Sequence, residues 1–155
     1  MNWAKDSGSN IKVIGFEPGK ETYKKCKEME SDSCVRIINK GLWDKDDKLY
    51  FQCDGQSVGY ISGEGQEIEV TSIDKVLNGE KVTFIKMDIE GSEMEALEGA
   101  RNTIDAHKPK LAISLYHKPE DIVAIPNRIL DIRNDYQFYL RLHTFGTQEL
   151  VLYCI

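Results

Sequence analysis

Apolar and polar positions along this chain follow two periods, one typical of strands and one of helices. Residues 82–89 are almost continuously apolar, which is typical of a parallel strand covered on both faces. After the turn residue Gly91, Ser92 and Glu95 have the spacing of a capping box that begins a helix. Apolar residues then recur at helical spacing as far as Ile104, which predicts one helix with a buried stripe.

The same patterns cover the rest of the chain. Further strands are expected at 11–16, 34–38, 111–116, 136–142 and 149–154, and further helices at about 20–29, at 73–77 and after Pro119. Three short segments, 49–53, 58–61 and 67–70, are polar on one face and predict a small antiparallel β appendage. Strands that alternate with helices predict an α/β three-layer sandwich, and the length of 155 residues predicts a single domain over 1–155.

Composition narrows the classes of partner. A net charge of −6 and a pI of about 5.1 argue against sequence-independent binding to nucleic acid or to an anionic membrane. No apolar run approaches the roughly twenty residues of a membrane span, and the N-terminus lacks the apolar core of a signal peptide. The cysteines are widely spaced and form no C-x-x-C pair, so we expect reduced thiols in a cytoplasmic protein and no structural zinc site. They are Cys26, Cys34, Cys53 and Cys154.

Candidate chemistry gathers where the strand at 82–89 ends. Asp88, Glu90 and Glu93 crowd this turn, and open α/β sheets bind ligands at the carboxyl ends of their strands. Stabilising a helix N-terminus requires one acid, so three predict a site in which Asp88 polarises a hydroxyl and Glu90 and Glu93 contact substrate. His117 ends the strand at 111–116 and is the candidate general base, with Asp88 as the second. The alternatives are helix electrostatics and a histidine that holds the turn at Lys118. No recognised metal-ligand spacing is present.

A further candidate ends the strand at 11–16. Glu17 is followed by Pro-Gly, and a carboxylate at this place in dinucleotide-binding folds and methyltransferases hydrogen-bonds both ribose hydroxyls. The alternative is an exposed loop glutamate that caps the next helix. This feature alone does not separate a site for S-adenosylmethionine from a site for a nicotinamide cofactor.

Four segments, read together, resemble the FkbM family of S-adenosylmethionine-dependent methyltransferases. They are KVIGFEPGKETYKKCK at 12–27, VRIINKGLWDKDDKLYF at 35–51, MDIEGSEMEALEGA at 87–100 and KPKLAISLYHKPEDIVAIP at 108–126. The resemblance implies a Rossmann-like class I methyltransferase sheet and methyl transfer to a hydroxyl of a sugar, glycan or polyketide-like small molecule. It also implies cofactor contacts from Glu17, from the backbone of Gly41 and Leu42 beside the adenine, and from Asp88 at the methionine amino group.

One part of the family pattern is missing from this sequence. Such methyltransferases begin with a strand and a glycine-rich loop that cradles the cofactor, whereas only MNWAKDSGSN precedes the strand at 11–16. We therefore expect a sheet that lacks its first strand, weak or absent cofactor binding, and an inactive chain. The alternatives are a non-catalytic remnant or interaction module and a nicotinamide-binding Rossmann protein. We also expect the strands at 11–16 and 82–89 to pair directly, with a homodimer as an accompaniment, or a second copy to cover the gap.

Overall fold

The computed structural model describes residues 11–28, 34–53, 59–144 and 149–155. The chain forms two compact units, Met1–Gly41 and Leu42–Ile155. None of the helices in the described ranges has the length and apolar character needed to cross a membrane.

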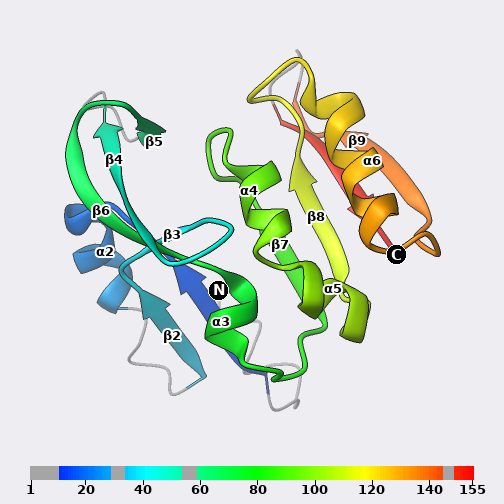
Figure 1. Cartoon of the computed structure of the whole chain (residues 1–155), viewed down its shortest axis with the longest axis horizontal. Helices are drawn as coiled ribbons and strands as arrows, with labels where there is room; N and C mark the ends of the chain where they lie inside the picture. The colour runs from blue at the N-terminus through cyan, green and yellow to red at the C-terminus, as the bar shows by residue number, and fades with distance from the viewer. Residues whose placement is uncertain (1–10, 29–33, 54–58, 145–148) are drawn as a thin grey trace. The chain divides into compact units, whose positions relative to one another are not determined.

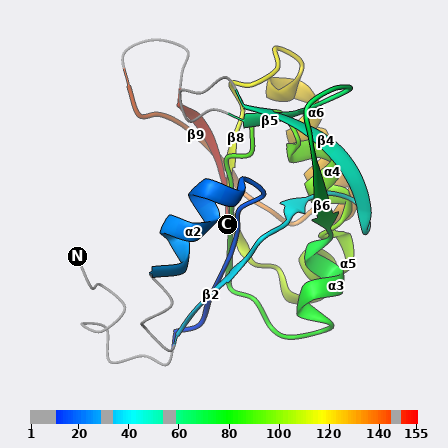
Figure 2. The ribbon, with the colours of Figure 1, turned by 90° about the vertical axis from the view of Figure 1, so that its left-hand side faces the viewer.

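The smaller unit is a strand–helix–strand element. β1 (Val13–Phe16) and β2 (Val35–Ile38) are parallel, in a register that places Val13 beside Val35. The crossover helix α2 (Lys20–Lys27) contacts β2 (Figure 2). These three elements confirm the strands and the helix that the sequence predicts in this region, with α2 ending at Lys27 rather than near residue 29.

The larger unit contains a four-stranded sheet that carries the candidate site. Its strands follow the order β7 (Phe84–Met87), β8 (Lys110–Ser114), β10 (Leu150–Cys154) and β9 (Phe138–Leu142). β7 and β8 are parallel, and β10 is antiparallel to both of its neighbours. The sequence-predicted strands in this region are thereby confirmed, each within a few residues.

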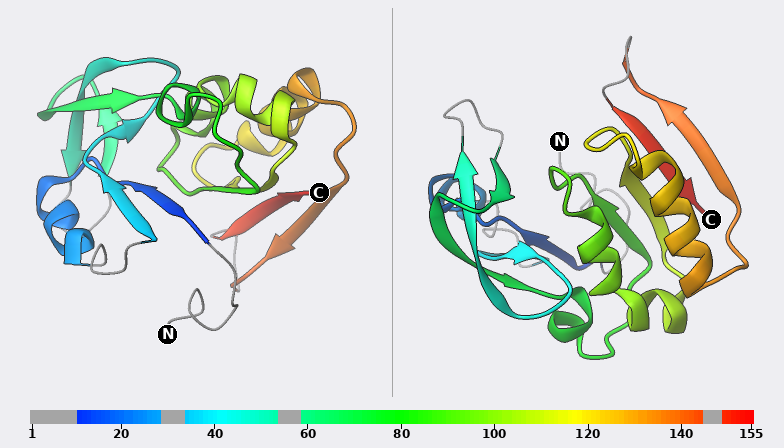
Figure 3. Two further views of the ribbon diagram at one scale, coloured as in Figure 1. Left: turned by 90° about the horizontal axis from the view of Figure 1, so that it is seen from below. Right: turned by 45° about the horizontal axis from the view of Figure 1, so that its top comes forward.

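Three helices cover one face of this sheet, as Figures 1 and 3 show: α4 (Glu93–Glu98), α5 (Arg101–His107) and α6 (Asp121–Ile132). The side chains between this helical layer and the sheet form the core of the unit. Its fully buried members include Met87, Leu97, Ile104, Leu111, Ile113, Ile125, Ile129 and Leu152.

A second four-stranded sheet forms the predicted appendage. Its order is β3 (Gly41–Leu42), β6 (Gln66–Thr71), β4 (Asp47–Cys53) and β5 (Gly59–Ser62), and β4 is antiparallel to both β5 and β6. The antiparallel character expected from its polar face is confirmed. Helix α3 (Ile73–Leu77) follows, with the Ser72 hydroxyl accepting a hydrogen bond from the Lys75 amide at 3.3 Å.

Two predictions about local structure are wrong. The Ser92 side chain makes no cap hydrogen bond; instead the Glu93 carboxylate accepts the Ile89 N–H at 2.9 Å. The helix expected to run to Ile104 divides into α4 and α5 at Gly99, where the backbone packs closely against a neighbouring loop. A Cβ atom on Gly99 would lie 2.1 Å from the Trp43 carbonyl oxygen.

The pairing predicted between the strands at 11–16 and 82–89 stays a prediction, because the two strands belong to different units. β1 pairs with β2 in a two-stranded sheet, and β7 belongs to the sheet of β8, β10 and β9. The expectation that the strand at 82–89 is covered on both faces is wrong, since Ile85 and Met87 of β7 are buried while Phe84 and Lys86 are exposed. The fold is mixed α/β as predicted; the three-layer, Rossmann-like arrangement without its first strand and the single domain over 1–155 stay predictions.

Candidate functional site

The parallel pairing of β7 and β8 brings the main candidate residues together. Met87 lies beside Ile113 in the register, so the residues that follow these strands leave the sheet at the same edge. Asp88 and Glu90 each lie within ion-pair distance of His117 at this edge, and Glu93 joins them from the first turn of α4.

His117 is the centre of the cluster, and its side chain is 7 % exposed. Its Nδ1 lies 2.9 Å from Glu93 Oε1. Because a carboxylate only accepts hydrogen bonds, Nδ1 is the donor. Its Nε2 lies 3.3 Å from Glu90 Oε2 and 3.6 Å from Asp88 Oδ1. Yet Nε2 is buried and makes no hydrogen bond with any residue that the structure describes.

Glu93 lies inside the molecule, where the sequence analysis expected a substrate contact. Its side chain is 0 % exposed, and Oε1 accepts from both the Ile89 amide and His117. Oε2 has no hydrogen-bond partner among the described residues. Since both hydrogen-bond partners of Glu93 are internal, in this structure Glu93 acts on the site through His117.

The charges of this pair reinforce each other. Burial opposes protonation of His117, but the carboxylates of Glu93, Glu90 and Asp88 outweigh it and raise the His117 pKa. Burial likewise favours the neutral form of Glu93, but hydrogen bonds from His117 and from the Ile89 amide lower its pKa. The pair is therefore an imidazolium and a carboxylate over a wider pH range than either group would show alone.

Asp88 is held by hydrogen bonds from its neighbours. Tyr116 donates its hydroxyl to Oδ1 at 2.8 Å, and Lys86 donates to Oδ2 at 2.9 Å. Burial would raise the Asp88 pKa, but the hydrogen bonds from Lys86 and Tyr116 lower it. A carboxylate stabilised in this way is a weak base. Sequence reasoning missed Lys86 and Tyr116 as site residues; a lysine inside an otherwise apolar strand was the available signal.

Glu90 stands in a strained turn. Its φ is 56° and that of Gly91 is 90°, so a non-glycine residue occupies the left-handed region at a cost of about 1–2 kcal/mol. Such strain persists where surrounding structure fixes the backbone, and it gathers at functional sites. The turn directs the Glu90 carboxylate toward His117. In the described parts of the chain, no group of three or more His, Cys, Asp or Glu side chains has an arrangement that could hold a metal ion.

The remaining predicted cofactor contacts belong to other elements. Glu17 follows β1, and its Oε1 accepts the Gly19 amide at 2.7 Å, directly before α2. Asn39, which sequence reasoning missed, donates to the Glu17 carbonyl oxygen at 2.8 Å and fixes the turn. One carboxylate oxygen of Glu17 therefore has the role that the helix-capping alternative predicts. Gly41 and Leu42 form β3, and both are buried.

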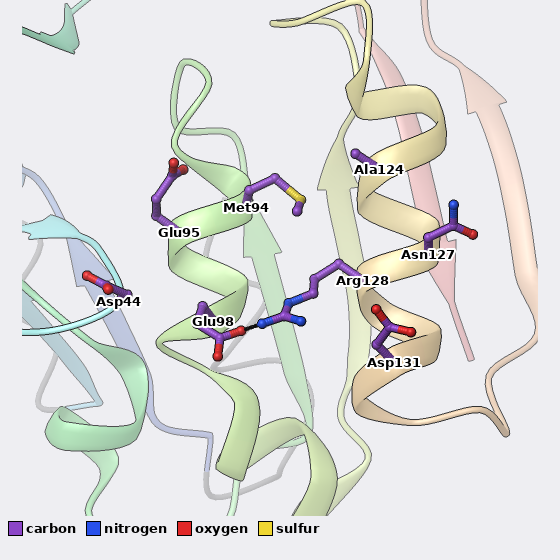
Figure 4. A pocket seen from close by; sticks show the side chains of 8 residues that line it. All are labelled: Asp44, Met94, Glu95, Glu98, Ala124, Asn127, Arg128 and Asp131. Atoms are coloured by element: carbon purple, nitrogen blue, oxygen red, sulfur yellow. Dashed lines mark ion pairs between the residues drawn. The ribbon is translucent and has the colours of Figure 1, made fainter.

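A pocket lies elsewhere in the larger unit. It occupies about 420 Å³ between α4 and α6 and contains an ion pair between Arg128 and Glu98 (Figure 4). Its lining is rich in carboxylates and includes none of the predicted site residues. The lining residues are Asp44, Met94, Glu95, Glu98, Ala124, Asn127, Arg128 and Asp131.

The fold and the cluster define a mixed α/β protein with titratable groups at the ends of adjacent parallel strands, where proteins of this class bind ligands. Residues 1–140 match the model of the methyltransferase FkbM domain. The chain belongs to this FkbM methyltransferase family, which confirms the resemblance found in the sequence.

One solved structure supports the assignment. The crystal structure of methyltransferase FkbM from Methylobacillus flagellatus KT matches with a TM-score of 0.72 and 34 % sequence identity over 93 % of this chain. The match spans 36 % of that protein's chain. None of the curated proteins gives a significant match.

Proposed function

We propose that this FkbM domain serves an S-adenosylmethionine-dependent O-methyltransferase, in which His117 is the general base and Glu93 positions it. The acceptor is a hydroxyl of a sugar, glycan or polyketide-like small molecule. The observation that carries the proposal is the buried His117 Nε2, which lies at the strand edge without a hydrogen-bond partner among the described residues. Buried polar atoms are rarely left unpaired in native proteins, so Nε2 is suited to receive a hydroxyl group.

The cofactor supplies an electrophilic methyl group on a sulfonium when it is bound. Two residues have suitable chemistry to hold it. Glu17 uses one carboxylate oxygen on the Gly19 amide and keeps the other for a ribose hydroxyl. Asp88 offers a negative charge to the methionine ammonium. Gly41 and Leu42 would contribute backbone contacts beside the adenine. Because the chain spans about a third of the matched protein, the activity is proposed for the protein that carries this domain.

The roles of the carboxylates follow from their partners. Glu93 holds the Nδ1 proton, so the neutral imidazole keeps its free electron pair on Nε2. When the cofactor supplies its methyl group to the acceptor oxygen, Nε2 would take the proton of that hydroxyl. Glu90 and Asp88 then stabilise the imidazolium that forms. Asp88 itself is the weaker candidate base, because Lys86 and Tyr116 lower its pKa.

The test separates proton transfer from cofactor binding. Transfer of labelled methyl from S-adenosylmethionine to a panel of hydroxyl acceptors measures turnover, and calorimetry with S-adenosylhomocysteine measures affinity. His117→Ala should lower turnover by about a hundredfold or more at unchanged affinity, whereas Glu17→Ala should weaken affinity. His143→Ala is the matched control, since His143 is an exposed histidine bonded to Tyr153.

Two results would contradict the proposal. Near-normal turnover in His117→Ala would make the histidine a turn residue. A domain that binds no cofactor and transfers no methyl group, in a chain shown to be folded, would favour the non-catalytic module. The pH profile adds a check: because the His117 pKa is raised and the base must be neutral, turnover should rise with pH above the ordinary histidine range. Glu93→Gln should move that rise to lower pH.

A further inference from the structure

The strand β9 forms one border of the four-stranded sheet in the larger unit. β10 is its neighbour on one side, and no strand of the described ranges pairs with its other side. Gln137 and Ile155 exchange both of their backbone hydrogen bonds. Because bonded positions alternate along an antiparallel pair, the backbone N–H and C=O groups of Tyr139 and Arg141 also point toward β10. The N–H and C=O groups of Phe138, Leu140 and Leu142 therefore point outward along an open edge.

The side chains of this edge strand are mostly apolar and exposed. Tyr139 is 52 % exposed, Leu140 62 % and Leu142 51 %, and Arg141 is the one charged residue of β9. Proteins usually protect an open edge with several charges, a proline or a bulge. β9 has none of these beyond Arg141, so an edge of this composition suits a second strand.

Apolar surface continues from β9 onto α6. Ile125 and Ile129 of α6 are buried against the sheet, and Arg128 faces α4 across the pocket. Helical geometry then places Ile122 and Leu130 on the flank away from α4, and they are 49 % and 41 % exposed. Figures 1 and 3 show β9 on this same side of α6. The edge strand and the helix flank border one apolar surface.

We propose that a second copy of this chain docks on β9, with the two strands antiparallel around a two-fold axis at Leu140. The sequence of β9 is complementary to itself in this register. Leu140 meets the partner's Leu140, and Phe138 meets the partner's Leu142. On the opposite face Tyr139 meets the partner's Arg141, a cross-strand contact of a cation with an aromatic ring.

The hydrogen-bond pattern agrees with the same axis. In an antiparallel pair centred on Leu140, the outward-facing backbone groups of Phe138, Leu140 and Leu142 become the bonded positions. A shift by one residue would pair groups that already face β10. The opposite border of the sheet is less suited to a second copy, because β7 places Lys86 in the middle of a short edge, and edge lysines oppose strand addition.

Sedimentation equilibrium of the 155-residue chain tests the interface. We expect a reversible monomer–dimer equilibrium with a dissociation constant in the micromolar range, as befits a small interface. Leu140→Lys should raise that constant roughly tenfold or more, because two like charges meet at the axis. Phe84→Lys is the matched control: Phe84 is an apolar residue, 54 % exposed, on the other border strand, and its change should leave the equilibrium unaltered.

Cysteine cross-linking tests the register. The Cα atoms of opposed residues in the bonded position lie about 5.5 Å apart, within disulfide range, so Leu140→Cys should give an oxidised dimer. Leu142→Cys should not, since it lies about 14 Å from its own copy in this register. The unchanged chain supplies the background from its native cysteines.

Three outcomes overturn the proposal. One is a monomer at all concentrations up to about 1 mM, which would leave the face to a different occupant. Another is a dimer that Phe84→Lys dissociates and Leu140→Lys does not. The third is equal cross-linking at positions 140 and 142. Circular dichroism of each variant separates a lost interface from a lost fold.

Discussion

Removing the His117 side chain should destabilise the protein strongly, because it leaves Glu93 buried without its partner. In His117→Ala the Glu93 carboxylate, 0 % exposed, keeps a single hydrogen bond from the Ile89 amide. Its other oxygen already has no partner in the described part of the chain. Breaking a buried pair by removing one member typically costs about 3–5 kcal/mol. That is a large share of the roughly 5–15 kcal/mol by which domains are stable.

The pH dependence identifies the cause of the loss. In the wild type the Glu93 pKa is lowered by His117 and the Ile89 amide against the effect of burial, so its contribution is present at neutral pH and is lost as pH falls. In His117→Ala the effect of burial dominates and raises the Glu93 pKa. Protonation of Glu93 at low pH then removes the cost of keeping a charge buried. The difference in the free energy of unfolding between the two proteins should therefore shrink as pH falls, beginning above the ordinary glutamate pKa of about 4.5 and continuing below it.

Urea denaturation followed by circular dichroism measures these free energies. In thermal melts at neutral pH, the Tm of His117→Ala should lie about 6–20 °C below that of the wild type, from the scaling for chains of this length. The double variant Glu93→Gln/His117→Ala should recover about half of the loss or more, since a neutral amide is far less costly to bury. A loss under about 1 kcal/mol in His117→Ala, or a double variant no more stable than the single one, would refute the reasoning.

Three further predictions test other parts of the larger unit. The His117 pKa is raised, so the stability that His117 contributes to the fold is complete below about pH 6.5 and is lost as pH rises through the folded-state pKa. Urea titrations should show this decline in the wild type and not in His117→Gln. Asp74 accepts the Asn102 and Thr103 amides at 3.0 and 2.8 Å, so Asp74→Ala should cost about 1–2 kcal/mol in thermal melts, against under about 0.5 for the exposed Asp131→Ala. Gly99→Ala should cost about 1–3 kcal/mol, because its Cβ would meet the Trp43 carbonyl; stabilisation relative to the control Gly63→Ala, whose Cβ meets open space, would contradict the packing.

Local patterns predicted most elements and the place of the site. The apolar runs at 82–89 and 111–116 became β7 and β8; β8 is buried on both faces, whereas β7 is buried on one face and exposes Phe84 and Lys86 on the other. The sequence placed Asp88 and Glu90 at the end of one strand and His117 at the end of another, and the parallel pairing of these strands groups the three residues at one edge. The family resemblance had the same local basis, in segments quoted from the chain.

Non-local features were outside the reach of such patterns. The alternation of apolar residues says which faces of a strand are covered, and not that β1 pairs with β2 while β7 borders another sheet. At the division of α4 from α5, Gly99 lies close to Trp43, more than fifty residues earlier in the chain. Contacts between distant segments of this kind carry no periodic signal.

The burial of Glu93 is different, because the sequence held a signal for it. The buried residues Ala96, Leu97 and Ala100 follow Glu93 by three, four and seven positions, which is the spacing of one helix face. Glu93 therefore lies on the buried stripe of α4 and not in the solvated turn before it. An acid in such a position requires a hydrogen-bonded or cationic partner. His117, at the end of the neighbouring strand, carries a positive charge beside Glu93 when it is protonated and loses that charge when it gives up the proton. The same periodicity that located the helix thus predicts a carboxylate–imidazole pair, and it gives Glu93 a positioning role that its place beside Asp88 and Glu90 alone would not indicate.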